Sequence, residues 1–405
     1  MPGPLSGIRI FDLSRILAGP SATQLLGDLG AEVIKIERPG QGDDTRAWGP
    51  PYLKDEAGRD TGESAYYLSC NRSKRSVTLD IAKPEGQALA RRLITTSDVV
   101  IENFKSGDLA RYGLDYQSLR SDFPRLVYCS ITGFGQTGPY APHAGYDILI
   151  QAMGGIMSIT GAADGPPMKV GVAIVDVMCG MYASVAILAA LRHRDQTGIG
   201  QFIDLALLDT QVSWLVNQGA NYLISGKAPG RLGNAHPNIV PYTVMPASDG
   251  WFVLGVGNDA QYAKFCDFAG RPELATDERF RTNADRVKNR AVLYPILEEI
   301  TRARPQSAWV KSLSKLGVPA GPVNSIDRVF ADPQVQARGM RIEMPREGVE
   351  GGSVPLIGNP IKFSETPVEY RDPPPRLGEH TEEVLRTFLG LSAEEIAGLR
   401  ARAVI

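Results

Sequence analysis

The hydrophobic positions near the start of the chain alternate between the period of a strand and that of a helix. Gly7–Leu13 alternates between apolar and polar residues as a strand does, and Ala31–Glu37 is predicted to be a second strand. Between them, Ser21–Leu29 has helical spacing, follows the loop Ser14–Pro20 and ends before Gly30. Two strands joined by a helix form a parallel βαβ unit, which binds ligands where its strands finish.

The same alternation continues over the next part of the chain. Strands are predicted at Val77–Asp80, Asp98–Asn103, Leu126–Thr132 and Phe202–Leu207, and helices at Pro84–Thr96, Gly145–Gly161 and Leu208–Ile224. Strands that alternate with helices favour a mostly parallel sheet covered on both faces. The first loop lacks GxGxxG, so the sequence does not indicate the usual dinucleotide site.

The sequence pattern changes near Gly226, where loops rich in glycine and proline replace the alternating strands and helices. Proline and glycine become frequent again from Asp332. We therefore predict an α/β protein with a large domain over residues 1–225 and a smaller domain over residues 226–330. Residues 331–405 form a return segment that ends in helices Thr381–Leu389 and Ser392–Arg402.

One acid, Asp176, interrupts the apolar run Met168–Leu191. An ionised carboxylate in apolar surroundings costs several kcal/mol unless it is compensated. Asp176 is therefore a cap for a helix that begins near Val177, a residue of a membrane span, or a group held in a cleft for chemistry. The small residues of the run, and the lack of a second such segment, favour the core helix of a soluble protein over a span.

Composition narrows the functional classes. The chain has 405 residues, 43 Lys and Arg against 45 Asp and Glu, and a net charge of −2, which gives no bulk attraction to nucleic acid or membrane. Its four cysteines form no CxxC pair and its four histidines lack metal-ligand spacing, so no metal site is expected. The start has no apolar signal core, which predicts a cytoplasmic protein, or a mitochondrial-matrix protein if a presequence was removed.

Recognition of an anion must then come from local groups. Basic residues lie near predicted strand and helix boundaries, where the topology can gather them into a rim suited to phosphates: Arg38, Arg72, Lys74, Arg75, Lys105 and Arg111. The loop Arg38–Pro51 also carries Arg46 and Trp48, which suit a carboxylate held over an aromatic face, although Arg46 can equally pair with Asp43 or Asp44.

Several motifs spread over the chain resemble those of the class III CoA-transferases, the formyl-CoA transferase family. They are GIRIFDLSRILAGP, GAEVIKIERPGQGDDTR, CNRSKRSVTLD, VIENFKSGDLARYG, the Asp176 helix with TGIGQ, GVPAGPVNS and PPPRLGEHTEEVL. The likeness is closer to the succinyl-CoA:glutarate CoA-transferase group, through GDDTRAWGPP, RLGNAHPNIVPY and GVGNDAQY.

The resemblance implies a Rossmann-like large domain built from both chain ends, a small central domain and an interlocked homodimer. It also implies that Asp176 is the nucleophile, with coenzyme A as a co-substrate and no permanently bound cofactor. The residues matched to CoA binding are Arg38, Lys74, Arg75, Asn103, Phe104, Arg111, Leu17 and Ala18. The candidates for binding the acid are Arg46, Trp48, Tyr146, His236 and Gly257.

The implied reaction moves CoA from a donor such as succinyl-CoA to a dicarboxylic acid, through an aspartyl anhydride and an aspartyl-CoA thioester. Backbone N–H groups of Gly255–Asn258 are candidates for stabilising the oxyanion. Two alternatives remain open. An α-methylacyl-CoA racemase shares the fold but needs a base on each side of the α-carbon. At the position where the racemases have a histidine, this chain has Tyr146, which is a poor base at neutral pH. A non-catalytic CoA-binding subunit would keep the fold without turnover.

Overall fold

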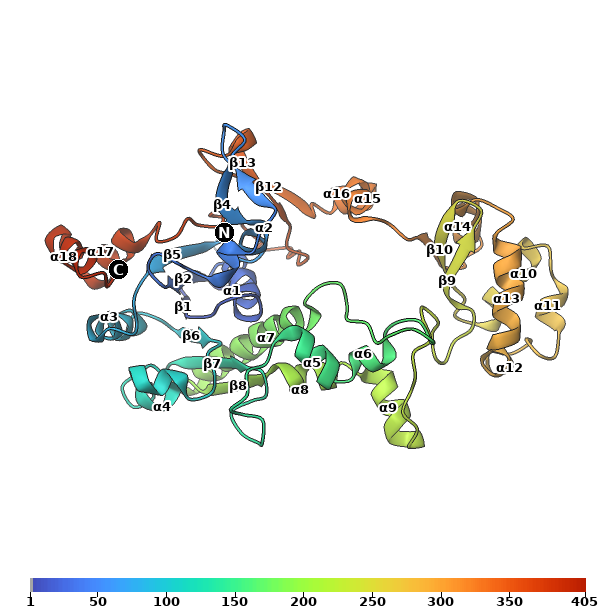
Figure 1. The fold of residues 1–405 in the computed structure, drawn as a ribbon, viewed down its shortest axis with the longest axis horizontal. Helices are drawn as coiled ribbons and strands as arrows, with labels where there is room; N and C mark the ends of the chain where they lie inside the picture. Colours follow the sequence, from blue (N-terminus) through green and yellow to red (C-terminus); the bar gives the residue numbers. More distant parts are fainter. Residues whose placement is uncertain (1–2) are drawn as a thin grey trace. The chain divides into compact units, whose positions relative to one another are not determined.

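A six-stranded parallel sheet forms the centre of the computed structural model, which describes residues 3–405 (Figure 1). The strands lie in the order β5-β2-β1-β6-β7-β8, which is the doubly wound order 3-2-1-4-5-6 in the sequence of the chain. Their bounds are β1 Arg9–Asp12, β2 Glu32–Glu37, β5 Lys74–Thr78, β6 Val99–Glu102, β7 Val127–Thr132 and β8 Phe202–Ala206. The predicted α/β class with a mostly parallel sheet is confirmed.

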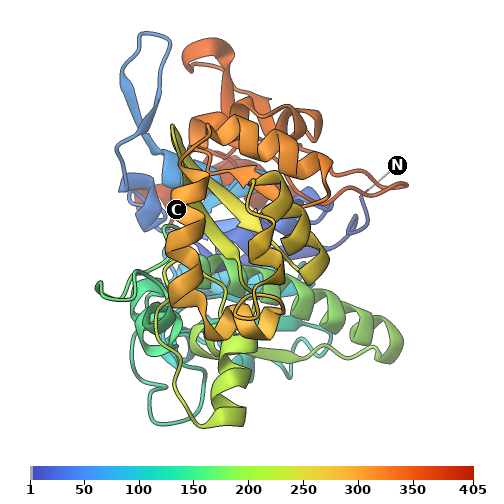
Figure 2. The same cartoon turned by 90° about the vertical axis from the view of Figure 1, so that its right-hand side faces the viewer.

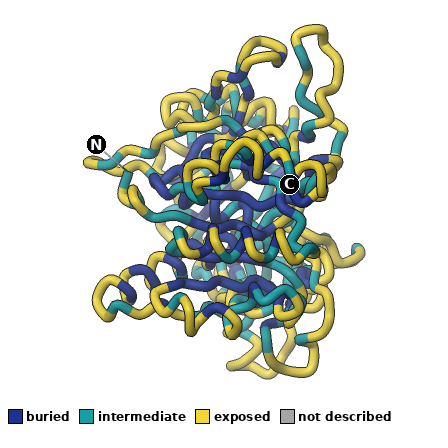
Figure 3. The backbone as a smooth tube through the Cα atoms, turned by 90° about the vertical axis from the view of Figure 1, so that its left-hand side faces the viewer, coloured by how far each residue is buried: buried dark blue, intermediate teal, exposed yellow. Residues whose placement is uncertain are grey.

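Helices cover both faces of this sheet, and the strands between them are buried (Figure 3). On one face, Phe11, Ile34 and Val100 pack with α3 (Pro84–Ile94), α17 (Thr381–Leu389) and α18 (Ala393–Ala401). On the other face, Ile10, Val33 and Val99 pack with α1 (Ala18–Asp28) and α7 (Ile174–Thr197). Alternate side chains of each strand therefore enter two separate cores, which explains the consecutive apolar residues of β1, β2 and β6.

Contacts divide the chain into two units, each of which is described by itself. Unit 1 comprises residues 1–155, 170–220 and 334–405, so both chain ends contribute to it. Unit 2 comprises residues 156–169 and 221–333. The sequence analysis had assigned residues 156–169 to the large domain.

Shorter elements complete unit 1. The remaining strands form two hairpins: β3 Tyr52–Lys54 with β4 Asp60–Ser64, and β12 Arg341–Pro345 with β13 Ser353–Ile357. The remaining helices are α2 Ala65–Ser69, α4 Tyr116–Leu119, α5 Asp147–Met153 and α8 Leu207–Ser213, with 3₁₀ turns at Asp44–Ala47, Asp108–Tyr112 and Glu350–Gly352. Two helices cross the boundaries between the units: α9 Val216–Ser225 and α16 Pro333–Ala337.

Unit 2 is built on a three-stranded antiparallel sheet with its own core (Figure 2). The strands lie in the order β11 (Ala320–Pro322), β10 (Gly250–Gly255) and β9 (Tyr242–Ala247). Trp309 is fully buried beside Phe252 and Phe265, and its indole N–H donates to the Thr301 carbonyl at 2.8 Å. The helices are α6 Ile156–Ile159, α10 Asp259–Phe268, α11 Glu273–Thr276, α12 Asn283–Lys288, α13 Arg290–Thr301, α14 Gln306–Lys315 and α15 Ile326–Ala331.

Proline and glycine account for two differences from the predicted elements. Helix α1 begins at Ala18, before the predicted Ser21, because Pro20 lies in its first turn, where a proline needs no N–H partner. The predicted helix Gly145–Gly161 is instead two short helices, α5 and α6, because Gly155 adopts a φ of +90° between them.

Helix α7 is the one helix among residues 3–405 that is long and apolar enough to cross a membrane by length and composition. That composition also suits a core helix, and 44% of its most apolar window is buried in the protein. Its buried side includes Cys179, Ala183 and Ile187, which pack in the core shared with α1.

Candidate active site

The carboxyl ends of β1 and β6 carry the loops that surround two adjoining cavities. The strand order reverses between these neighbours, and ligands of doubly wound proteins bind at this point. One cavity, of about 490 Å³, contains Arg38 and Arg111 and is called the Arg38 cavity. The other, of about 230 Å³, contains Asp176 and is called the Asp176 cavity. Three residues line both cavities: Arg15, Phe104 and Asp108.

Asp176 is the third residue of α7 and lines its cavity from the first turn of that helix. The helix starts at Ile174, and its N-cap, Ala173, makes no side-chain capping bond, so Asp176 is not the cap that one hypothesis required. Within residues 3–405, no hydrogen bond or ion pair reaches the Asp176 carboxylate. The backbone N–H of Asp176 donates to Asp147. The carboxylate is left free for chemistry in the cavity.

Asp147 supplies the bonds that the N-terminus of α7 lacks. Its Oδ1 accepts the N–H of Val175 at 2.8 Å and, more weakly, that of Asp176 at 3.4 Å. Its Oδ2 accepts the amide of Gln151 at 2.6 Å, which fixes the carboxylate from its own helix α5. Asp147 therefore holds the first turn of α7, and with it the backbone of Asp176.

Burial, followed by the negative charge of Asp147, raises the pKa of Asp176 to about 7. Asp176 also influences an aromatic pair. Burial and then the charge of Asp176 raise the pKa of Tyr66 to about 12, and the Tyr66 ring meets Trp48 edge-on at 5.2 Å between centroids. The half-exposed Trp48 is thereby linked to the surroundings of Asp176 through Tyr66.

The first turn of α1 lies against α7 beside Asp176. A Cβ on Gly180 would stand 2.6 Å from the carbonyl oxygen of Ala18 and 2.3 Å from the hydroxyl of Ser21, so only glycine allows this approach. Because Gly180 lies one helical turn after Asp176, the close approach brings Leu17 and Ala18 into the Asp176 cavity. No hydrogen bond of the described residues engages the N–H groups of Leu17 and Ala18.

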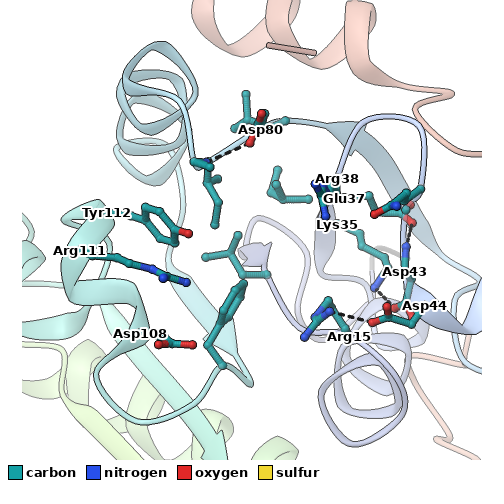
Figure 4. Close-up of a pocket in the computed structure, with 18 residues that line it drawn as sticks. Arg15, Lys35, Glu37, Arg38, Asp43, Asp44, Asp80, Asp108, Arg111 and Tyr112 are labelled. Carbon is teal, nitrogen blue, oxygen red and sulfur yellow. Dashed lines mark hydrogen bonds and ion pairs between the residues drawn. The ribbon is translucent and has the colours of Figure 1, made fainter. Parts of the chain in front are cut away.

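The Arg38 cavity combines aromatic rings with charged groups of both signs (Figure 4). Its cations are Arg15, Lys35, Arg38 and Arg111, and its acids are Glu37, Asp43, Asp44, Asp80 and Asp108. Arg38 follows β2, Arg111 belongs to the 3₁₀ turn after β6, and Phe104 and Tyr112 provide the rings. Arg111 also lies over the Tyr112 ring, with 4.7 Å between the guanidinium carbon and the ring centroid. Such a cavity suits a phosphate-bearing aromatic ligand.

Lys74 and Arg75, both predicted to bind CoA, line neither cavity. β5 begins at Lys74, three residues before the predicted strand, so both residues belong to the sheet. The Lys74 ammonium is fully buried and donates to the Pro20 carbonyl at 2.8 Å and to Asn71 Oδ1 at 2.9 Å. Arg75 pairs with Glu32 and Glu383 and lines a separate cavity at the amino ends of the strands.

Arg46, predicted to bind a substrate carboxylate, already has carboxylate partners within the protein. Its Nε and Nη2 donate to the two oxygens of Glu37 at 2.8 and 2.7 Å, and the guanidinium lies on the Tyr67 ring at 3.7 Å. Asp43 and Asp44, the partners considered from the sequence, are engaged with Lys35 and Arg15 instead. A substrate role for Arg46 would require breaking a buried bidentate pair, so Arg46 is left out of the proposed site.

The other residues predicted to bind CoA or the acid differ in whether their polar groups already form hydrogen bonds within the protein. Tyr146 is largely exposed and lines the Asp176 cavity. The amide of Asn103 also lines it, but both amide atoms bond the backbone of Arg15. His236 and Gly257 belong to unit 2, where His236 Nδ1 accepts the N–H of Asn238 and the N–H of Gly257 donates to Gln261.

The proposed oxyanion donors of Gly255–Asn258 are therefore mostly engaged. The N–H of Gly255 donates to Pro319 and that of Val256 to Pro241, while the Asn258 side chain caps α10. Leu17 and Ala18, whose N–H groups make no hydrogen bond within the described residues, belong to the lining of the Asp176 cavity. No cluster of three or more His, Cys, Asp or Glu residues that could hold a metal ion occurs in residues 3–405.

Sequence reasoning missed four residues of this site: Arg15, Tyr66, Asp147 and Gly180. Arg15 had a signal, since it directly follows a strand that ends at the ligand-binding edge. Asp147 is an acid before an apolar helical run, but nothing local indicates that it caps a different helix. The arrangement as a whole provides a free carboxylate, unengaged backbone donors and an adjoining cavity that contains Arg38 and Arg111.

Comparisons with known proteins identify the family of the chain. A family model described as CoA-transferase family III matches residues 5–381. The chain is 53% identical over 382 residues to the succinate–glutarate CoA-transferase of Agrobacterium fabrum, covering 94% of this chain and 95% of that protein. It is 44% identical over 402 residues to the human succinyl-CoA:glutarate CoA-transferase, with 99% and 90% covered. A crystal structure of a CAIB/BAIF family protein from Brucella suis matches with a TM-score of 0.85 at 50% identity, covering 96% of this chain and all of that one.

Proposed function

Because this chain belongs to CoA-transferase family III, we propose that it transfers CoA from succinyl-CoA to glutarate or a similar dicarboxylic acid. Enzymes of this class use CoA as a co-substrate. The names of the Agrobacterium fabrum and human relatives support the substrate pair. The observation that carries the proposal is the unpaired Asp176 carboxylate in a cavity that adjoins the one containing Arg38 and Arg111.

The two cavities suit the two ends of a CoA thioester. Arg38 and Arg111 supply charge for the nucleotide phosphates and Phe104 supplies a ring for the adenine region. The pantetheine arm then passes Phe104 into the Asp176 cavity, along Leu17 and Ala18. This path brings the thioester to Asp176.

In the first half-reaction, an oxygen of the ionised Asp176 carboxylate attacks the thioester carbonyl of succinyl-CoA. The C–S bond breaks, CoA leaves as the thiolate, and a succinyl-aspartyl anhydride forms. In this proposal, the free N–H groups of Leu17 and Ala18 donate to the oxyanion of the tetrahedral intermediate. The thiolate then attacks the aspartyl carbonyl of the anhydride, which releases succinate and leaves CoA on Asp176 as a thioester.

The second half-reaction repeats these steps in the reverse order. A carboxylate oxygen of the incoming acid attacks the aspartyl thioester and again expels the CoA thiolate. The thiolate attacks the acyl carbonyl of the new anhydride, forming the product thioester and restoring the Asp176 carboxylate. Neither anhydride survives contact with water, so the site must exclude it. Ile16, Ile131 and Leu207 supply apolar lining to the Asp176 cavity, whereas Val175, expected from the sequence to form such a wall, is buried in the core.

The incoming acid meets Asp176 from the side of Trp48, Tyr66 and Tyr146 in this proposal. Tyr66 shares the electrostatic surroundings of Asp176, and Tyr146 lines its cavity. Both hydroxyls can donate to a carboxylate. His236 and Gly257 of unit 2 remain proposed contacts to the acid.

A panel of acids tests the substrate pair. The purified protein is incubated with succinyl-CoA and one of glutarate, itaconate, malate, mesaconate or acetate, and each new acyl-CoA is separated and quantified. We expect glutarate to give the highest kcat/KM among them and acetate the lowest. Transfer to acetate at the glutarate rate would exclude selection of dicarboxylic acids, and no transfer to any acid would refute the proposed function.

Racemase chemistry is the second candidate, because His143 lines the same cavity as Asp176. A racemase needs two bases facing one α-carbon, and a His–Asp pair can provide them. The protein is incubated in deuterated water with a 2-methylacyl-CoA and no acceptor acid. Deuterium at the α-carbon within a few turnovers would favour the racemase, whereas a transferase leaves that position unlabelled.

We also propose that the protein is a homodimer, interlocked as the family resemblance implies. Helices α5 and α7 expose apolar side chains that are each at least 37% accessible: Ile148, Leu149, Met153, Met181, Val185 and Leu188. An apolar surface of this kind on a soluble chain suits an interface with a second copy. Light scattering at micromolar concentration should give twice the chain mass, and Val185→Glu should lower it toward the monomer.

A further inference from the structure

Arg15 occupies the junction between the two cavities, since it lines both of them. Arg38 and Arg111 line the Arg38 cavity alone, so among the described residues Arg15 is the arginine shared between the cavities. Figure 4 shows its side chain beside Asp44, on the opposite side of the cavity from Arg111. A ligand that extends from one cavity into the other passes this guanidinium.

The backbone of Arg15 is fixed from both sides. Its N–H donates to Asn103 Oδ1 at 2.8 Å, and its carbonyl accepts Asn103 Nδ2 at 2.7 Å. The next residue, Ile16, has a φ of +72°, a left-handed conformation that is unfavourable for a β-branched residue. The N–H of Ile16 is held by Asp43, whose carboxylate is itself paired with the buried Lys35. The surroundings therefore impose one position on the start of the Arg15 side chain.

The end of the side chain, in contrast, is available. Arg15 Nη1 pairs with Asp44 Oδ2 at 2.7 Å, but both side chains are 48% exposed. An exposed pair of this kind contributes about 0–1 kcal/mol, so a better anion displaces Asp44 readily. Within the described residues, the hydrogen bonds of this guanidinium engage Nη1 alone, which leaves Nε and Nη2 to donate.

We propose that Arg15 binds the diphosphate group of the CoA carrier at the junction of the two cavities. The proposal rests on the proposed function, which directs the nucleotide to the Arg38 cavity and the thioester to Asp176. The diphosphate connects the nucleoside to the pantetheine arm, so it is the charged part of the ligand that crosses between the cavities. A planar guanidinium donates two parallel hydrogen bonds to such a group.

Titration calorimetry with the full-length chain tests this contact without requiring turnover. The probes are CoA, dephospho-CoA, which keeps the diphosphate, and 3′-AMP, which lacks it. Arg15→Gln should lower the affinities for CoA and dephospho-CoA by the same factor, roughly 10- to 100-fold. The affinity for 3′-AMP should fall by about twofold or less. Arg59→Gln, which removes an equal charge from an exposed hairpin arginine, is the matched control and should leave all three affinities within about twofold.

Three results would overturn the proposal. An unchanged CoA affinity would mean that Arg15 makes no contact with the carrier. Equal weakening of all three probes would mean that the substitution distorts the cavity. A retained CoA affinity with a raised KM for glutarate would assign Arg15 to the acid instead. Failure of the proposed function is separate: a chain that binds CoA in this pattern but transfers it to no acid keeps the Arg15 contact.

Discussion

Replacing Asp176, the proposed nucleophile, with its uncharged isostere should make the protein more stable at alkaline pH. Asp176 has no bonding partner among the described residues, and burial and Asp147 raise its pKa from 3.8 to about 7. The folded state therefore holds a proton that the unfolded chain releases above pH 4. Stability falls as the pH rises from about 4 to about 7, and the loss is complete above pH 7.

The size of the effect follows from this shift in pKa. A change from 3.8 to about 7 corresponds to at most about 4 kcal/mol. Water reaches the half-buried carboxylate through the cavity and screens it, so we expect about 2 kcal/mol for Asp176→Asn. For a chain of 405 residues, that is an increase in melting temperature of about 2–3 °C above pH 7.5.

Scanning calorimetry of the parent and of Asp176→Asn at half-unit steps from pH 4.5 to 8.5 measures this difference. The gain should be near zero at the acid end and should grow toward pH 7. Asp195→Asn, which neutralises an exposed acid at the far end of the same helix, is the control and should show no such trend. A gain that does not vary with pH, or a variant less stable than the parent at pH 8, would refute the reasoning about Asp176.

Three further predictions concern the surroundings of the nucleophile. With succinyl-CoA limiting, kcat/KM should fall tenfold per pH unit below a midpoint of about 7, because only the ionised Asp176 attacks; a flat profile from pH 5.5 to 8 would contradict this. Asp147→Asn should move that midpoint to lower pH by removing a negative charge, and should lower the free energy of unfolding by about 1 kcal/mol through weaker bonds to the start of α7. A midpoint that stays in place would show that Asp147 does not act on Asp176. Gly180→Ala should lower the free energy of unfolding by about 1–3 kcal/mol and reduce kcat, since the added methyl meets the Ala18 carbonyl. Gly230→Ala, which places its methyl in open space, is the control and should change neither. Equal behaviour of the two variants would contradict the close approach of α1 and α7.

The parallel sheet could be predicted from the sequence because its strands are buried on both faces and are separated by amphipathic helices. Val99–Glu102 and Val127–Thr132 lie within the predicted strands for this reason. The resemblance to a family identified the enzyme class, and the apolar setting of Asp176 marked that residue as unusual. The start of α1 could not be predicted, because Pro20 indicates a loop unless its place in the first turn is known.

The direction of the basic side chains was beyond sequence reasoning. Arg38 and Lys74 both lie near a strand boundary, but Arg38 follows the end of β2 whereas Lys74 is the first residue of β5. A shift of three residues in the start of that strand takes Lys74 from a loop into the interior, where it bonds Pro20 and Asn71. Arg46 likewise meets Glu37, a residue on another element, and no local pattern indicates that pairing.

The covalent role of Asp176 is the central claim, and mass spectrometry of peptides from the digested protein tests it most directly. The protein is incubated with succinyl-CoA and no acceptor acid, quenched in acid, digested and analysed for modified peptides. We predict an adduct of CoA mass on the peptide that contains Asp176, absent from Asp176→Ala and lost from the parent when glutarate is added before the quench. An adduct on another residue, or transfer of CoA to glutarate by Asp176→Ala at the parental rate, would contradict the account.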